Sequence, residues 1–219
     1  SGNKYRKWKY NLLAAKDQGF KKLLTFGGAF SNHIAAVAGA GKEFGFETIG
    51  IIRGEEIKDK IQDNPSLQFA QENGMQFHFV DRTTYKNKTD ATFVEELQQL
   101  YGDFYLIPEG GTNALAIKGC EEILTETDKA YFTHVCCAMG TAGTISGIIN
   151  SSNEKQQIIG FSSLKGDFLS DVIRNFATKD NWNTYCDNIF GGYGKVSDPL
   201  IQFLNEFYRN TTIPLDPVY

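Results

Sequence analysis

The chain has 219 residues with a formal net charge of -4, and 41% of its residues are hydrophobic. This length and apolar content can bury a real core. Acidic and basic residues are interspersed, so the sequence offers neither a basic stripe for nucleic acid nor a cationic face for a membrane. We therefore expect a globular protein whose partner is a small molecule.

The cysteines and the apolar runs indicate the cellular compartment and the kinds of site that the sequence disfavours. Cys120, Cys136, Cys137 and Cys186 lack the spacing of a zinc site, and the adjacent pair is a poor frame for a disulfide. No apolar run approaches the length of a transmembrane helix. We predict a reduced, cytoplasmic protein without a metal site. Because the chain does not begin with Met, the removal of a targeting segment before residue 1 stays an open alternative.

The first segment, "SGNKYRKW" (residues 1–8), places Lys4 behind Ser-Gly-Asn, with further basic residues after it. A lysine that must lose its proton and act as a nucleophile is activated by cationic neighbours. We expect a compact turn that holds Lys4 as a reactive amine. A solvated surface lysine is the ordinary alternative.

From residue 21 onward the pattern alternates between strand and helix. Apolar runs ending in glycine predict strands, and capped or periodic segments predict helices. The predicted strands are residues 21–26, 46–54, 75–81, 103–111, 131–140 and 156–163. The predicted helices are residues 31–45, 64–74, 90–102, 113–126, 140–151, 167–179 and 198–210. This alternation predicts an α/β fold of parallel sheets covered by helices.

Two strand-to-helix junctions carry candidate site residues, because parallel sheets bind ligands where strands end and helices begin. The first is "TFGGAFSNH" (25–33), in which Ser31 and Asn32 place polar groups at a helix start. The second is "CCAMGTAGTISG" (136–147), where backbone amides and the hydroxyls of Thr141 and Thr144 suit a phosphate dianion. Ordinary capped turns are the alternative interpretation of both.

Other chemistries fit less well. "AGAGKEF" (38–44) is no P-loop, since Ala36 stands where the first glycine belongs and Glu43 where magnesium needs Ser or Thr. "GTAGTISG" lacks the spacing of a dinucleotide fingerprint. Nothing joins His33, His78 and His134 as metal ligands or as a catalytic dyad, so structural roles are expected for them.

A reactive lysine, a phosphate nest and a Ser-Asn turn are together what pyridoxal phosphate (PLP) requires. The stretches that carry these features, with two others, occur in a recognisable order: "SGNKYRKW", "GGAFSNHIAA", "PEGGTNALA", "MGTAGTISG" and "IPLDPVY". In that order they resemble the 1-aminocyclopropane-1-carboxylate (ACC) deaminase and D-cysteine desulfhydrase family of PLP enzymes. The resemblance spans nearly the whole chain and implies the two-domain fold of tryptophan synthase β type.

The resemblance implies a role for each matching residue. Lys4 matches the lysine that carries the cofactor, and Lys7 matches one that helps hold its phosphate. Asn32 matches the residue that bonds the ring hydroxyl oxygen, and Ser31 a serine close to the substrate. The implied phosphate loop is Gly140, Thr141, Ala142, Gly143 and Thr144; the implied substrate contacts are Ser31, Asn32, His33 and Tyr219, with Tyr219 also catalytic.

The family's geometry implies a small domain, residues 13–111, inserted into a large PLP-binding domain of residues 1–12 and 112–219. It places the cofactor in the cleft between them, and it implies closure over the substrate and a homodimer. We expect the chain to be incomplete at both ends. The partner of the pyridine nitrogen and a second active-site tyrosine then lie outside it.

Departures from the family pattern bear on substrate choice. Phe30 stands where members often carry Gln, and Ile34 and Ala35 where a basic or amide residue is common. The resemblance implies a lyase or deaminase acting on a small amino acid, and D-cysteine desulfhydrase-like elimination is the preferred prediction. ACC deaminase and D-serine-type elimination are the runners-up. A PLP-binding protein without catalysis stays as an alternative from another class.

Overall fold

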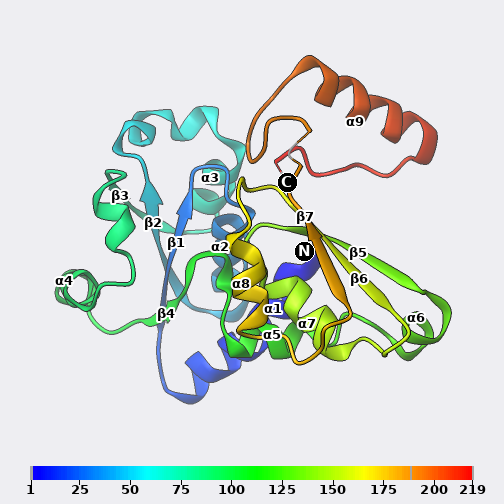
Figure 1. Ribbon diagram of the computed structural model, residues 1–219. Coiled ribbons are helices and arrows are strands. Elements are labelled where there is room, and N and C mark those ends of the chain that lie inside the picture. The colour runs from blue at the N-terminus through cyan, green and yellow to red at the C-terminus, as the bar shows by residue number, and fades with distance from the viewer. Residues whose placement is uncertain (1, 188, 219) are drawn as a thin grey trace. The chain divides into compact units, whose positions relative to one another are not determined.

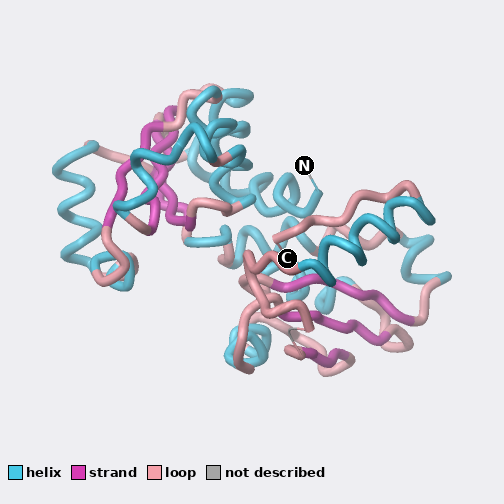
Figure 2. Tube along the Cα trace, turned by 90° about the horizontal axis from the view of Figure 1, so that it is seen from above, coloured by secondary structure: helices cyan, strands magenta, loops and turns pink. Residues whose placement is uncertain are grey.

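The computed structural model describes residues 2–187 and 189–218. Two compact units make up the chain, Ser1–Gly119 and Cys120–Tyr219. Each unit contains its own parallel sheet (Figure 2). The predicted α/β fold with parallel sheets is thus confirmed. The predicted division at residues 13–111 stays a prediction.

The sheet of the first unit has the strand order β3-β2-β1-β4. Its strands are β1 (Lys22–Gly28), β2 (Glu47–Arg53), β3 (Gln76–Val80) and β4 (Tyr105–Ile107). Every neighbouring pair is parallel, and Leu23 of β1 lies opposite Thr48 of β2 and Tyr105 of β4. All carboxyl ends therefore meet at one edge, where the glycines that close β1 lead into the next helix.

Five α-helices and three short 3-10 helices are described in this unit. They are α1 (Gly2–Asp17), α2 (Asn32–Phe44), α3 (Pro65–Glu72), α4 (Ala91–Tyr101) and α5 (Ala114–Cys120), with η1 (Glu55–Asp63), η2 (Thr84–Asn87) and η3 (Glu109–Gly111). The predicted start of α3 is confirmed: Pro65 opens it, and the Asn64 side chain accepts from the Leu67 amide at 3.0 Å.

The central strands of the first unit, β1 and β2, are buried on both faces. On β1, Leu23 packs with Trp8 of α1 and Val37 of α2 in one core cluster, whereas Leu24 packs with Leu97 of α4 in another. Successive side chains of a strand point to opposite faces, so the sheet lies between two helical layers. Figure 1 shows α2 and α4 with the sheet of this unit.

The second unit has a three-stranded parallel sheet, β5-β6-β7. Its elements are α6 (Glu126–Tyr131), β5 (His134–Met139), α7 (Gly143–Ser151), β6 (Gln157–Ser162), α8 (Phe168–Arg174), β7 (Trp182–Tyr185) and α9 (Asp198–Thr211). Ile145 of α7 and Leu169 of α8 pack with Ile158 of β6 in one core cluster. On the other face of the sheet Cys136 is exposed, and Phe161 stacks on Tyr185 with ring centroids 5.7 Å apart.

Three elements differ from the sequence prediction. Lys4 lies in the long helix α1, so the expected compact turn is wrong; the buried residues Trp8, Leu12 and Ala15 recur at helical spacing among the basic ones. Helix α6 was unpredicted although Thr125 and Asp128 form its capping box. Strand β7 was also unpredicted, because four residues hold a strand only through pairing with β6. Within the described residues, no helix is both long and apolar enough to span a membrane.

Candidate functional site

Helix α1 presents three candidate residues on one face. Lys4 is half-buried in its first turn, and Lys7 and Trp8 follow one turn later, only 2% and 3% exposed. Side chains three and four positions apart share a helix face, so the three belong to one stripe. The buried Lys7 ammonium donates to Gly110 O at 2.9 Å and to Thr112 Oγ1 at 3.4 Å, which joins α1 to the turn after β4.

The turn between β1 and α2, residues 28–32, brings Ser31 and Asn32 to the carboxyl edge of the sheet. The Ser31 amide donates to Gly28 O at 3.1 Å, and Ser31 then caps α2 through its position alone, without a side-chain capping bond. Gly27 is required before the turn, since a Cβ there would meet Ile34 Cγ1 at 2.5 Å. The Ser31 hydroxyl does not make the capping bond that is usual for a serine at a helix start.

His33, in the first turn of α2, is 1% exposed. Its Nε2 lies 2.6 Å from Thr25 Oγ1, and the Thr25 hydroxyl lies 2.8 Å from Ile107 O, to which it donates. The Nδ1 atom is buried and has no hydrogen-bond partner. Burial lowers the pKa of His33 well below its ordinary value, and the charges of Lys4 and Lys7 lower that pKa further.

The first unit thus contains five of the predicted site residues: Lys4, Lys7, Ser31, Asn32 and His33. The two lysines lie close enough to His33 for their charges to act on its ring, and His33 lies directly after Asn32. Because the His33 side chain is engaged with Thr25, the predicted substrate contact of this residue would come from its backbone.

The predicted phosphate loop lies in the second unit, between β5 and α7. Ala142 has a φ of 60°, a left-handed conformation that a non-glycine residue rarely adopts. Helix α7 begins at Gly143 without a side-chain capping bond. Amides of a first helical turn have no partner within the helix, and a strained residue before them is typical of binding sites. The loop therefore has the form of an anion site.

The predicted phosphate loop, residues 140–144, belongs to the second unit, and the predicted Tyr219 lies outside the described residues. Sequence reasoning missed Trp8, whose ring centroid is 4.8 Å from that of His33, and Gly111, where a Cβ would come 3.0 Å from Trp8. The signal for Trp8 was its helical spacing from Lys4.

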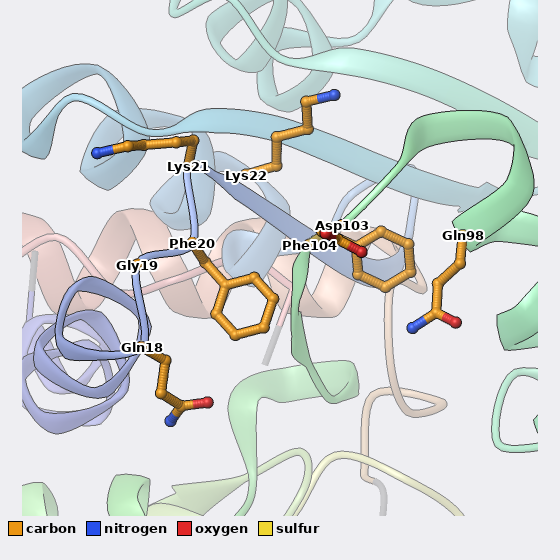
Figure 3. A pocket seen from close by; sticks show the side chains of 8 residues that line it. All are labelled: Gln18, Gly19, Phe20, Lys21, Lys22, Gln98, Asp103 and Phe104. Atoms are coloured by element: carbon orange, nitrogen blue, oxygen red, sulfur yellow. The ribbon is translucent and has the colours of Figure 1, made fainter.

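A surface hollow of about 570 Å³ lies elsewhere in the first unit (Figure 3). Its lining residues are Gln18, Gly19, Phe20, Lys21, Lys22, Gln98, Asp103 and Phe104. They surround the amino ends of β1 and β4, opposite the edge where parallel sheets bind ligands. Lys22 there already donates to Tyr101 O at 2.7 Å. This hollow is not the candidate active site. The described residues also hold no group of His, Cys, Asp or Glu able to bind a metal ion.

The groups present fit PLP. Lys4 supplies a half-buried amine beside a second lysine, and the Ser31 turn supplies a hydroxyl that caps nothing. The α7 loop supplies an uncapped helix start behind a strained Ala142. Taken separately, the first unit thus holds an amine and hydrogen-bond donors, and the second holds a dianion site, which are the types of group that this cofactor needs.

Comparisons with known proteins agree with this donor set. A family model described as pyridoxal-phosphate dependent enzyme matches residues 1–207. A Thermotoga maritima protein named as a candidate ACC deaminase is 30% identical over 241 residues, which cover 100% of this chain and 76% of that protein. The bifunctional mitochondrial D-cysteine desulfhydrase/ACC deaminase of Arabidopsis thaliana is 26% identical over 248 residues, with coverages of 100% and 61%.

Solved structures show the same fold. The crystal structure of an ACC deaminase homologue superposes with a TM-score of 0.82 at 25% identity, covering 100% of this chain and 71% of that one. Maize serine racemase gives a TM-score of 0.66 at 17% identity, with coverages of 98% and 69%. The chain therefore belongs to the pyridoxal-phosphate dependent enzyme family, as a PLP-dependent lyase or deaminase of its ACC deaminase and D-cysteine desulfhydrase group.

Proposed function

We propose that this protein is a D-cysteine desulfhydrase-like lyase, which converts D-cysteine and water into pyruvate, ammonia and sulfide. The observation that supports it is the grouping of Lys4 with the Ser31 turn in one unit, beside a buried His33. Loss of a Cα proton and of a thiol from neighbouring carbons needs one well-placed base more than it needs specialised machinery. A half-buried lysine in the first turn of a helix can serve as that base.

The chain's own residues take the following roles in this proposal. Lys4 would hold the cofactor, and its amine would take the proton from the substrate Cα. Asn32 would bond the cofactor ring, and residues 140–144 would hold its phosphate through amides and hydroxyls. Backbone amides of the Ser31 turn receive the substrate carboxylate. When bound, PLP draws electron density away from the substrate Cα, which makes its proton removable.

Substrate choice falls to the residues that depart from the family pattern. Ile34 is fully buried in the core of the first unit, so it is a packing residue. Phe30, in contrast, is 52% exposed in the turn immediately before Ser31. We expect the Phe30 ring to favour a compact substrate with an apolar or sulfur-bearing side chain over one that needs an amide contact at this position.

ACC deaminase activity is the second candidate. The observation that favours it is that the Ser31 hydroxyl makes no capping hydrogen bond to helix α2. The Cα of ACC bears no hydrogen, so opening of its ring needs either a nucleophile or proton loss from Cβ. A hydroxyl spared from capping could act as that nucleophile. The product would be 2-oxobutyrate with ammonia, which distinguishes this reaction from elimination on D-cysteine.

The test is an assay of the full-length protein reconstituted with PLP. Sulfide and pyruvate are measured with D-cysteine and, in parallel, L-cysteine, and 2-oxobutyrate is measured with ACC. Release of sulfide that is selective for the D enantiomer supports the proposal. Release of 2-oxobutyrate without sulfide replaces it with the second candidate. Visible absorption of bound cofactor without any keto acid would favour a non-catalytic PLP-binding protein.

We also propose a cytoplasmic homodimer, with a small amino acid as its substrate and with neither nucleic acid nor a membrane as a partner. The net charge of -4 with interspersed signs supports the absence of a polyanionic partner. Sedimentation of the reconstituted protein measures the oligomeric state, and cell fractionation measures the location.

A further inference from the structure

Helix α1 lies against the segment that follows β4, residues 110–119, which we call the α1 seat. Near its start, a Cβ on Gly111 would come 3.0 Å from the ring of Trp8. At its end, a Cβ on Gly119 would clash with the carbonyl oxygen of Arg6. Close approach at both ends needs glycine, and it holds the backbone of α1 against the seat.

Between these two glycines the α1 seat contains a pair of amides, Asn11 of α1 and Asn113 at the start of α5. Asn113 Nδ2 donates to Asn11 Oδ1 at 2.7 Å, and Asn11 Nδ2 donates back to Asn113 Oδ1 at 3.2 Å. Asn11 Nδ2 also donates to Lys7 O at 2.9 Å, and Asn113 Oδ1 accepts from the Ala116 amide at 2.8 Å. A carbonyl can only accept and a backbone amide can only donate, so these backbone partners determine the orientation of both side chains.

Asn11 is 0% exposed and uses its full capacity for hydrogen bonds. Its two N–H groups donate to Lys7 O and Asn113 Oδ1, and its oxygen accepts from Asn113 Nδ2. The same oxygen accepts from the Tyr105 hydroxyl of β4 at 3.3 Å. Apolar side chains pack in several relative positions, whereas a buried amide with every donor and acceptor used is satisfied in one. The amide pair therefore fixes the rotation of α1 about its axis and its position along that axis.

The face of α1 that meets the seat is also the face that carries Lys4. Lys4, Trp8 and Asn11 follow one another at spacings of four and three residues, so they lie in one stripe. Lys4 precedes Asn11 by seven residues, which is two helical turns or about 10 Å along the axis. Because α1 runs as one helix from Gly2 to Asp17, a rotation at Asn11 turns Lys4 with it.

We propose that Asn11 and Asn113 are positioning residues: their amide pair sets the direction in which α1 presents the Lys4 amine to the aldehyde of the cofactor. The pair acts through the backbone of α1, so neither side chain needs to contact the cofactor. The inference rests on the proposed role of Lys4 and extends it to two residues that lie two helical turns away or in another helix.

Asn113→Ser separates this role from helix capping. Serine is also a favoured N-cap, so α5 keeps its cap, but the shorter side chain no longer reaches Asn11. Asn64→Ser is the matched control, because Asn64 caps α3 in the same unit through a 3.0 Å bond from the Leu67 amide and lies outside the α1 seat. Asn113→Asp is a milder variant, which keeps the cap and the acceptor for Asn11 and loses the donor. Thermal unfolding of each variant establishes that it is folded.

The readout needs no substrate and compares two aldehydes. The full-length apoprotein is mixed with PLP or with pyridoxal, which lacks the phosphate, and visible absorption follows capture; the signal of Lys4→Ala is subtracted. We expect Asn113→Ser to slow the capture of both aldehydes by a similar factor of about 10-fold or more, because misplacement of a reacting group by about 1 Å can cost on the order of 10²-fold. Asn113→Asp should lie between Asn113→Ser and the wild type, and Asn64→Ser should stay within about 2-fold of the wild type.

A double variant tests whether the two amides act as one unit. Asn11→Ala alone should slow capture at least as much as Asn113→Ser, since it removes every bond of the buried amide. Residues that act through a shared interaction give non-additive effects, so Asn11→Ala combined with Asn113→Ser should be no slower than Asn11→Ala alone. Additive slowing would show that the two residues act separately, and it would overturn the proposal for the pair.

Two further results would overturn the inference. Capture by Asn113→Ser at the wild-type rate would leave the pair a structural tie, and slowing with PLP alone would mean that the pair acts on the phosphate site. If the capture rates follow the expected order but D-cysteine yields no sulfide, the proposed substrate fails and the role of the pair stands. If D-cysteine is turned over and the expected order is absent, the role of the pair fails alone.

Discussion

The two units of the chain are built on parallel sheets that are covered differently. In the first unit β1 and β2 are buried almost along their length, because helices pack on both faces. In the second unit β5 alternates between exposed and half-buried residues, and the helices α7 and α8 pack on one face. A parallel sheet with one face open is uncommon.

The two units also supply different chemistry. The first supplies side chains: an amine from Lys4, a hydroxyl from Ser31 and a buried imidazole from His33. The second supplies backbone: a strained Ala142 and an uncapped helix start. Side-chain chemistry needs a packed surround to fix orientation, while an anion site needs only the geometry of a loop. We therefore expect substitutions in the first unit to have larger effects on activity and stability than substitutions in the second unit.

The largest effect is expected from Lys4→Ala. Loss of the amine that holds the cofactor and takes the substrate proton should lower kcat by at least about 10³-fold, with the free energy of unfolding little changed. Turnover of D-cysteine and visible absorption of bound cofactor measure it. Lys16→Ala, on the exposed end of the same helix, is the matched control and should behave as the wild type. Substantial residual turnover would remove Lys4 from the mechanism.

The next largest effect is expected on stability, when a methyl group is added at one glycine in each unit. In Gly119→Ala the added Cβ would clash with the carbonyl oxygen of Arg6, and backbone of α1 cannot move aside. In Gly160→Ala it would meet Ile145 Cδ1 at 2.6 Å and the flexible end of Met139. Overpacking costs about 1–3 kcal/mol, so we expect Gly160→Ala near the lower end and Gly119→Ala at or above the upper end. Urea unfolding measures both, and the reverse order would contradict this account.

A pH effect is expected in the first unit. Burial lowers the pKa of His33, and it also lowers the pKa of the partly buried His78. As pH falls below about 6.5, the unfolded histidines take up protons that the folded ones do not. Stability is thus present above that pH and falls below it, by up to about 1.4 kcal/mol per pH unit for the buried His33 and by less for the partly exposed His78.

Fluorescence can locate this effect, since Trp8 lies in the first unit and Trp182 in the second. Urea unfolding of Trp182→Phe between pH 7 and 5 follows the first unit, and the further change His33→Gln should reduce the slope. Three carboxylates also have a lowered pKa in the folded protein, and they change the stability only at a lower pH than the histidines do: Glu56, Asp81 and Asp128. An unchanged slope in the His33→Gln protein would show that this ring is not the source.

The smallest effect is expected from Ala142→Gly in the second unit. Glycine relieves the left-handed strain at φ 60° but loses a buried methyl group and adds freedom to the unfolded chain. We expect a change in the free energy of unfolding of no more than about 1 kcal/mol, with PLP affinity retained. Ala142→Val should instead lose more than about 1 kcal/mol, because a branched side chain resists this conformation. Equal stability of the two variants would exclude strain at this position.

The sequence by itself determined the alternation of strands and helices, the parallel sheets and both glycine junctions. These follow from local signals: apolar runs, a proline at a helix start such as Pro65 and glycines at strand ends. Helix α1 was missed because its buried stripe of Trp8, Leu12 and Ala15 is interrupted by charged residues. Strand β7 was missed because four residues carry too short a pattern, and only pairing with β6 defines it.

Only the tertiary structure decided the surroundings of the candidate site. The sequence named Lys4 and the Ser31 turn, yet nothing local in it shows that Trp8 contacts His33 or that Lys7 bonds Gly110, more than a hundred positions away. Nor does it show that the His33 ring meets Thr25, whose hydroxyl donates to Ile107 O. These contacts arise where separate strands and helices meet at one sheet edge, and burial there decides which polar atoms find partners.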